Sequence, residues 1–262
     1  MSEQLGTLAF TPEKKVTQAR CTYTISARGK PLEMPVFRYL RQNYGNFPLL
    51  EMESLFGFVE PSTLYGGRQY VRRELSDRDV FQLNNAGIGL RIPFTNHHAT
   101  VDEYDANRPL LEKYHRQGNS VITTHDDLAS WIRRDYPLYR LDASVIKNIN
   151  TLEKIKRAID IYDSVVLPMQ LNTNLEFLHS IECKDRITLF ANAGCAFTCP
   201  SKICYPSISK MNKPEGGVFQ CSQPLKKREM LGMIDFPLEP LIEMGFTQFK
   251  LLRSRPGGAT GF

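Results

Sequence analysis

The chemistry that this sequence could perform is concentrated in one cysteine-rich segment. Four of the six cysteines fall between positions 195 and 221, namely Cys195, Cys199, Cys204 and Cys221. Thiolates are the soft ligands that zinc and iron–sulfur clusters take from proteins. A proline beside a ligand cysteine, as in Cys199-Pro200, is common where the backbone wraps a cluster. The segment therefore predicts a metal centre held by these four cysteines.

Three interpretations of the cysteines are open. Zinc sites usually hold cysteine pairs with two to four intervening residues, a spacing that Cys195 and Cys199 fit. Cys204 and Cys221, in contrast, are separated by sixteen residues. One or two of the four could be buried cysteines without a ligand role, since free cysteine is among the most buried residue types. Ligand softness and spacing favour an iron–sulfur cluster. The spacing Cys-x3-Cys-x4-Cys differs from that of radical-SAM enzymes, a class we set aside.

The elements that position this segment are those of an α/β barrel. Short β-prone runs alternate with helical patterns, which is typical of βα units and a parallel sheet. The predicted strands are residues 21–26, 49–53, 89–93, 120–124, 139–143, 164–167, 186–191 and 248–252. The predicted helices are residues 101–116, 126–134, 152–162 and 174–180. We expect a closed (β/α)8 TIM-like barrel whose cysteine-rich loop follows the seventh strand, at the end where barrel active sites lie.

Length and composition are compatible with one such unit. We expect an N-terminal arm at residues 1–20 and a single barrel domain at 21–262, with the iron–sulfur loop at 192–224. The net charge of +5 is mild, so it allows an anionic ligand, and nucleic acid stays open as a partner. The sequence shows neither a signal-peptide pattern nor an apolar stretch of membrane-spanning length, and we therefore expect a cytoplasmic protein.

Several polar residues follow predicted strands and should reach the catalytic rim of a barrel. Asn96, His97 and His98 follow the third strand, and His125 follows the fourth. A histidine there could relay protons near neutral pH. The alternative for any one of them is a hydrogen bond to a loop carbonyl.

Two carboxylates alternate along the second predicted strand. Glu51 and Glu53 would therefore point to one face. If that face is the barrel interior, they are site candidates, and we include Glu51 among the catalytic residues. The alternative is a salt bridge to Arg68, Arg91 or Arg253.

A group of motifs extends this interpretation. The most specific is Asn192-Ala-Gly-Cys195-x3-Cys199-Pro200; the others are Gly66-Gly67-Arg68 and residues 85–96, 131–137, 165–168 and 249–253. Together they resemble the collagenase-like peptidase family U32, especially its short single-barrel members. The resemblance covers residues 45–255.

The resemblance implies a 4Fe-4S cluster and an oxygen-independent hydroxylase, as in the ubiquinone-biosynthesis and RNA-hydroxylation members of this family. Prephenate is the implied oxygen-donating co-substrate, and a nucleobase or other small aromatic molecule the implied substrate. Cys195, Cys199 and Cys221 match ligand positions. Where short relatives show a histidine, this chain has Tyr205, so Cys204 beside it is the candidate fourth ligand and Cys183 the fallback.

The resemblance also bears on substrate binding and on alternative functions. Arg68 and Arg253 lie in matching segments, and a planar guanidinium suits bidentate capture of a carboxylate such as those of prephenate; Asn96 is the third candidate. One alternative function is a U32-type peptidase, although no HExxH or Gly-x-Ser-x-Gly motif is present. The other is a non-catalytic cluster-binding subunit of a heterodimer with a related barrel.

Overall fold

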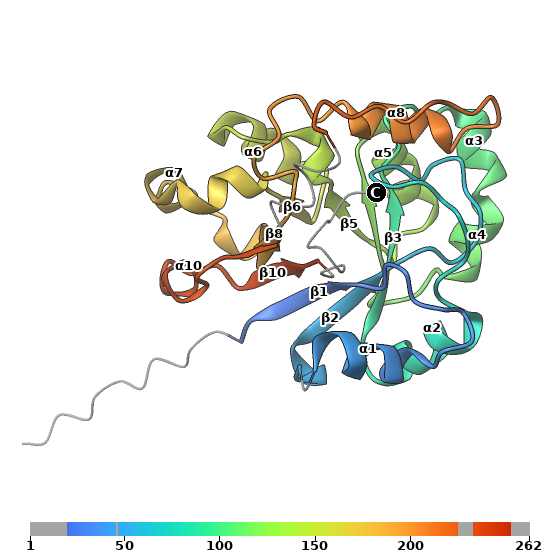
Figure 1. The fold of residues 1–262 in the computed structure, drawn as a ribbon, viewed down its shortest axis with the longest axis horizontal. Helices are drawn as coiled ribbons and strands as arrows, with labels where there is room; N and C mark the ends of the chain where they lie inside the picture. Colours follow the sequence, from blue (N-terminus) through green and yellow to red (C-terminus); the bar gives the residue numbers. More distant parts are fainter. Residues whose placement is uncertain (1–19, 46, 225–232, 253–262) are drawn as a thin grey trace, which may run out of the picture.

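The protein forms a closed barrel of parallel strands with helices around it (Figure 1). The computed structural model describes residues 20–45, 47–224 and 233–252. Neighbouring strands pair in the order β1-β10-β7-β6-β5-β4-β3-β2, and β2 closes back onto β1. The predicted TIM-like fold is confirmed. All of the arm predicted at 1–20 except residue 20 lies outside the described residues.

The barrel strands lie close to the predicted positions. They are β1 (Thr22–Ser26), β2 (Met52–Phe56), β3 (Gly89–Phe94), β4 (Ser120–Thr123), β5 (Arg140–Ala143), β6 (Ser164–Val166), β7 (Ile187–Phe190) and β10 (Gln248–Leu251). Successive side chains of each strand point alternately to the barrel interior and to the surrounding helices. In β3, Leu90 and Ile92 are fully buried in the apolar layer outside the barrel, whereas Arg91 and Pro93 point into the barrel.

The second strand begins later than predicted. Leu49–Glu51 form the short 3-10 helix η1 instead, with the backbone N–H of Glu51 donating to the carbonyl of Pro48 at 3.0 Å. Leu50 is 81% exposed, so this apolar pair does not belong to the barrel wall. Glu51 therefore lies before β2, at the N-terminal end of the barrel, and Glu53 alone of the two carboxylates joins the barrel interior.

Helices fill most connections between strands. They are α1 (Val36–Tyr44), α2 (Asp77–Asn85), α3 (Val101–Ala106), α4 (Arg108–Lys113), α5 (Asp126–Asp135), α6 (Leu152–Ile159), α7 (Leu175–His179), α8 (Cys204–Met211) and α10 (Glu239–Glu243). The helix predicted at 101–116 is two helices, because Asn107 caps the first and Pro109 starts the second. Within the described residues no helix is long and apolar enough to cross a bilayer.

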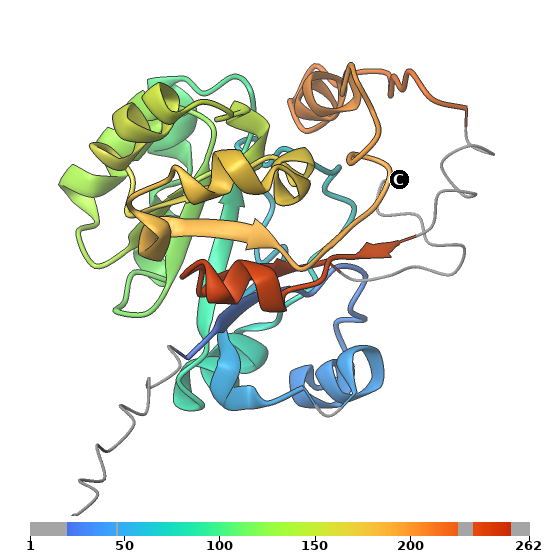
Figure 2. The same ribbon diagram turned by 90° about the vertical axis from the view of Figure 1, so that its left-hand side faces the viewer.

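The prolines of the cysteine-rich segment predict a loop, but the structure forms the α8 helix within it. Its Pro206 lies in the first turn, where a proline does not interrupt the hydrogen bonds of a helix. Figure 2 shows α8 (orange) standing apart from the helices that surround the strands. It belongs to the cysteine-rich segment that follows β7.

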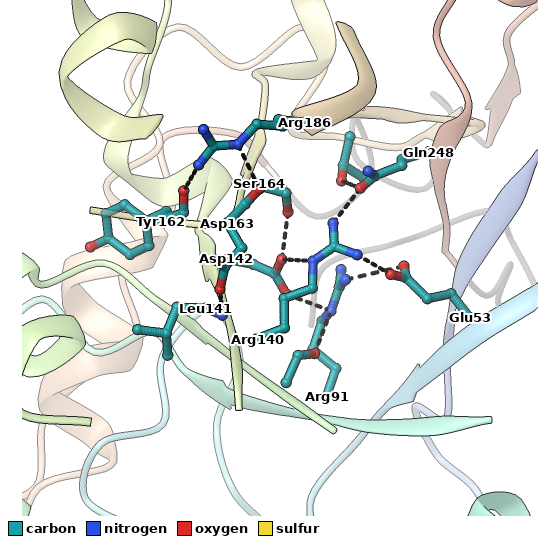
Figure 3. A network of polar contacts seen from close by, with 12 residues as sticks. Glu53, Arg91, Arg140, Leu141, Asp142, Tyr162, Asp163, Ser164, Arg186 and Gln248 are labelled. Atoms are coloured by element: carbon teal, nitrogen blue, oxygen red, sulfur yellow. Dashed lines mark hydrogen bonds and ion pairs between the residues drawn. The ribbon is translucent and has the colours of Figure 1, made fainter. Parts of the chain in front are cut away.

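The barrel interior contains a charged layer where most such barrels have bulky branched residues. Arg91 and Asp142 are 1% and 0% exposed, and Nε of the arginine lies 3.0 Å from the aspartate Oδ2. Figure 3 shows the surrounding network, in which Ser164 donates to Asp142 and Arg140 pairs with Glu53. Glu53 is thus an ion-pair partner of Arg140, which was not predicted, and at 3.5 Å of Arg91, which the salt-bridge alternative named.

We predict that Asp142→Ala destabilises the protein strongly, because it removes the closer of the two carboxylates that compensate the buried Arg91 guanidinium and leaves only the 3.5 Å contact with Glu53. Removal of one partner of a buried pair costs about 3–5 kcal/mol. Denaturant unfolding of both proteins measures the difference. The control is Glu153→Ala, which removes an exposed ion pair with Arg157 and should change the unfolding free energy little. Equal effects of the two substitutions would contradict a stabilising role for the buried pair.

Candidate functional site

The cysteine-rich segment is tied to the barrel at its base. It leaves β7 through β8 (Asn192–Ala193), which pairs antiparallel with β9 (Ile234–Asp235). The Asn192 side chain accepts a hydrogen bond from the N–H of Leu252 at 2.8 Å and donates to its carbonyl at 3.0 Å. The first residue of the Asn-x-Gly-Cys motif therefore joins the ends of β7 and β10 and fixes where Cys195 leaves the barrel.

The four cysteines of this segment all line one cavity of about 190 Å³. It opens at the C-terminal ends of the strands, since its walls include Ser26, Phe56, Pro93, Ile122, Ser144 and Phe190. In Figure 1 the α8 helix, which begins with Cys204, lies over this end of the barrel. The structure thus brings together the four residues that the sequence predicted as metal ligands.

The remaining two cysteines are at the other end of the barrel. Cys21 precedes β1, and Cys183 precedes the short helix η4 (Lys184–Arg186) that leads into β7. Neither lines the cavity. Cys204 therefore shares the cavity with the other three cysteines, whereas Cys183 does not. The structure joins none of these six cysteines in a disulfide.

The four thiols that line the cavity are the soft donor set that both zinc and iron–sulfur clusters take from proteins. Within the part of the chain that the structure describes, no three His, Cys, Asp or Glu side chains lie so that they could hold one metal ion.

The thiols influence one another electrostatically. Burial, and next the neighbouring Cys221, Cys195 and Cys199, raise the pKa of the Cys204 thiol to about 11. Burial also acts to raise the pKa of Cys199, but hydrogen bonds with Ser222 (3.5 Å) and from the backbone of residue 202 outweigh it, so that pKa lies below its ordinary value. Polar groups at Cys199 thus favour the thiolate, the form that binds metal.

Basic side chains line the cavity together with its thiols. Arg28, Arg68, Lys202 and Lys250 line it, and no Asp, Glu or His is among the described lining residues. A cluster with four thiolates carries net negative charge, and basic side chains around it reduce the electrostatic cost of burying that charge. The same side chains would attract an anionic substrate.

Asn96 and His97 fasten α8 to the barrel and do not line the cavity. The Asn96 amide nitrogen lies 2.9–3.0 Å from the carbonyls of Thr63, Tyr65 and Ser209. The backbone N–H of His97 donates to the Ser209 hydroxyl at 3.1 Å, and its Nδ1 lies 3.0 Å from the same oxygen. Their hydrogen bonds hold α8 in place, so both residues support the cysteine segment from outside.

The other predicted proton-relay residues also lie outside the cavity. The N–H of His98 donates to the Asn96 side chain, and His125 is the N-cap residue of α5. Glu51 lies at the opposite end of the barrel, ahead of β2. The structure does not bring these three residues to the cysteines.

The two predicted arginines differ in what the structure shows. Arg68 does line the cavity, but both its terminal nitrogens contact the Glu74 carboxylate and its guanidinium lies 3.9 Å above the Phe58 ring. The guanidinium of Arg68 is therefore already paired with a carboxylate of the protein, so it is not available for bidentate binding of a substrate carboxylate. Arg253 lies outside the described residues.

Sequence reasoning missed a further cavity residue, Lys250 in β10. A lysine between two apolar residues, Phe249-Lys250-Leu251, was the available signal, since alternation turns it away from the buried Phe249 and toward the interior. Its position relative to the cysteines, which are far away in sequence, required the fold.

Comparison with known proteins supports the fold. No protein-family model matches the chain, and no curated protein matches it either. Among solved structures, the U32 peptidase Mk0906 superposes with a TM-score of 0.60, over 95% of this chain and 99% of the other, at 14% sequence identity. At that identity the similarity shows a shared fold, which agrees with the fold implied by the motifs.

We predict that His97 contributes to the pH dependence of stability. Burial, and next the nearby His98, lower the pKa of His97 below its usual value of 6.5. The unfolded chain then binds the proton more readily, so stability falls as the pH drops from about 6.5 through the lower pKa of the folded state. The His97→Asn variant keeps a polar group near Ser209 but cannot be protonated, and should lose less stability on acidification.

Urea unfolding at neutral and mildly acidic pH measures this effect. The control is the exposed His179, whose replacement by Asn should leave the wild-type dependence intact. If His97→Asn unfolds with the same pH dependence as the wild type, His97 does not couple protonation to the attachment of α8.

Proposed function

We propose that this protein binds one 4Fe-4S cluster through Cys195, Cys199, Cys204 and Cys221 and is a redox enzyme. The observation that carries the proposal is that these four side chains line one cavity at the C-terminal mouth of a barrel, where enzymes of this architecture have their active sites. When bound, the cluster would supply one-electron transfer.

The walls of the cavity suit an aromatic or other largely apolar substrate with an anionic group. Phe56, Phe58 and Phe190 supply aromatic faces, and Ile122 and Ile208 supply aliphatic contacts. Such walls exclude water, which strengthens the electrostatic interactions of the basic side chains with a bound anion. The chain itself would therefore bind and orient the substrate beside the four cysteines.

The specific reaction that we propose is oxygen-independent hydroxylation with prephenate as oxygen donor. Prephenate can release hydroxide, because loss of carbon dioxide then makes its ring aromatic. Replacement of a C–H bond by C–OH with this hydroxide releases one proton and two electrons. An external electron acceptor is therefore part of the proposal. A nucleobase or a small aromatic quinone precursor fits the apolar walls.

The chemistry of the lining disfavours a peptidase. A cysteine nucleophile needs a base within hydrogen-bond reach, and the described lining residues include no histidine or carboxylate. A non-catalytic subunit in a pair of related barrels would use the same four ligands. Activity of the isolated chain distinguishes that role from the proposed enzyme.

We predict that the anaerobically purified protein contains about four irons per chain together with acid-labile sulfide, as a thiolate-bound cubane requires. Replacement of any one of the four cavity cysteines by Ala should abolish or strongly reduce the iron content and lower the melting temperature, because metal binding is linked to folding. Absorption spectroscopy, Mössbauer spectroscopy and iron and sulfide assays measure this outcome.

Cys21→Ala and Cys183→Ala are the matched controls, since both thiols lie at the far end of the barrel. They should keep the wild-type iron content. Stoichiometric zinc without sulfide would falsify the cluster assignment, and loss of iron in the Cys183 variant alone would move the fourth ligand from Cys204 to Cys183.

We further predict oxygen transfer without dioxygen. Holoprotein mixed anaerobically with prephenate and a chemical one-electron acceptor should add one oxygen atom to a nucleoside or an aromatic quinone precursor, as detected by mass spectrometry. The Cys199→Ala protein, lacking its cluster, should yield no product. Product that forms only after air is admitted would exclude prephenate as the donor while leaving the cluster assignment to the iron assays.

A further inference from the structure

Lys250 occupies an unusual position for a lysine. It lies in β10, between β1 and β7, with backbone register positions opposite Thr24 and Phe190. The residue is 8% exposed and lines the same cavity as the four cysteines. Its Nζ lies 4.6 Å from the ring centroid of Phe56 and 5.8 Å from that of Phe190. The amine is thus placed between two aromatic rings inside the barrel.

Two other buried or half-buried lysines, Lys30 and Lys147, have carboxylate partners. Nζ of Lys30, which is fully buried, lies 2.8 Å from Asp79, and Nζ of Lys147 lies 2.8 Å from Asp126. Within the described residues, the Lys250 amine has no hydrogen bond or ion pair, only the two ring contacts. Burial of an unpaired ammonium is costly. Such a lysine is difficult to explain as a structural element and is typical of a group that meets a ligand.

The surroundings favour the neutral amine. Burial, and next the positive charge of Arg91, lower the pKa of Lys250 to about 7, against the opposing effect of Asp142. Desolvation and a neighbouring cation are the two ways in which enzymes activate a lysine as a nucleophile. A substantial fraction of this amine therefore carries a free lone pair at neutral pH, unlike an ordinary lysine with a pKa of about 10.4.

We propose that Lys250 captures the carbonyl group of a 2-oxo acid in this cavity as an imine. The nitrogen lone pair attacks the carbonyl carbon and forms the C–N bond. The carbonyl oxygen leaves as water with the two protons of the amine, so no oxidant or reductant is consumed. The product is covalently bound to β10 in the cavity that the four cysteines also line.

The choice of a 2-oxo acid follows from the lining. The carboxylate of such a compound needs cationic neighbours, and Arg28 and Lys202 line the cavity together with Lys250. The body of the ligand would lie against Phe56 and Phe190, whose rings flank the amine. Prephenate is itself a 2-oxo acid, and to this extent the inference rests on the proposed function. Imine formation by Lys250 does not require the cluster.

The test uses pyruvate as the probe and cyanoborohydride, which donates hydride to an imine and converts it to a stable secondary amine. We expect one reduced pyruvyl group per chain, mapped by peptide mass spectrometry to Lys250 in the full-length protein. Lys250→Met and Lys250→Arg should lose this adduct. Lys147→Met, which removes a lysine already paired with Asp126, should keep it.

Iron is counted in the same samples. Failure of the imine proposal can then be distinguished from failure of the cluster proposal. Loss of the adduct in Lys250→Met with iron retained supports the inference, whether or not hydroxylation is observed. An adduct on Lys202, labelling spread over surface lysines and unchanged in the Lys250 variants, or no adduct at all would overturn it. The site of the adduct is mapped on the wild-type protein. The proposal can therefore still be contradicted if a Lys250 variant fails to fold.

Discussion

The buried ion pair between Arg91 and Asp142 determines what the barrel interior can hold. Side chains two residues further along the same strands, Pro93 and Ser144, already line the cavity. The charged pair is therefore the floor of the cavity, and the hydrogen bond from Ser164 helps to hold it. Burial of the two charges is tolerated because they compensate each other, with Glu53 and Arg140 as further partners at 3.5 and 3.3 Å. Apolar side chains in this layer would remove the positive charge of Arg91, which helps to lower the pKa of Lys250.

Most of the fold could be predicted from the sequence, because alternation and helical periodicity record which faces are buried. Every barrel strand was located within a few residues. The failures have local causes: exposed leucines at positions 49 and 50 resembled a strand, and Pro109 divided one periodic pattern into two helices. The helix that begins at Cys204 was not predicted because of Pro206. A proline in the first turn of a helix cannot be distinguished by sequence from a proline in a loop.

The candidate site was predictable only where its residues are close in sequence. Cysteine clustering identified the four residues that line the cavity. The histidine and asparagine predictions used only the rule that polar residues after barrel strands reach the rim. That rule cannot distinguish a side chain that faces the cavity from one, like His97, that bonds to Ser209 on an overlying helix. Lys250 was missed because its significance depends on its burial without an ion-pair partner among the described residues, which is a three-dimensional property.

The antiparallel ladder between β8 and β9 also has a consequence for how the molecule unfolds. It closes the cysteine segment at its base, where Asn192 is bonded to Leu252 beyond β10. The barrel strands pair with one another without using any residue of that segment. Opening of the segment therefore need not spread to the barrel, and the part that carries the four cysteines can behave as a separate cooperative unit of lower stability. A barrel whose cysteine segment has opened would keep its strand pairing, so the segment could close again without refolding of the whole chain.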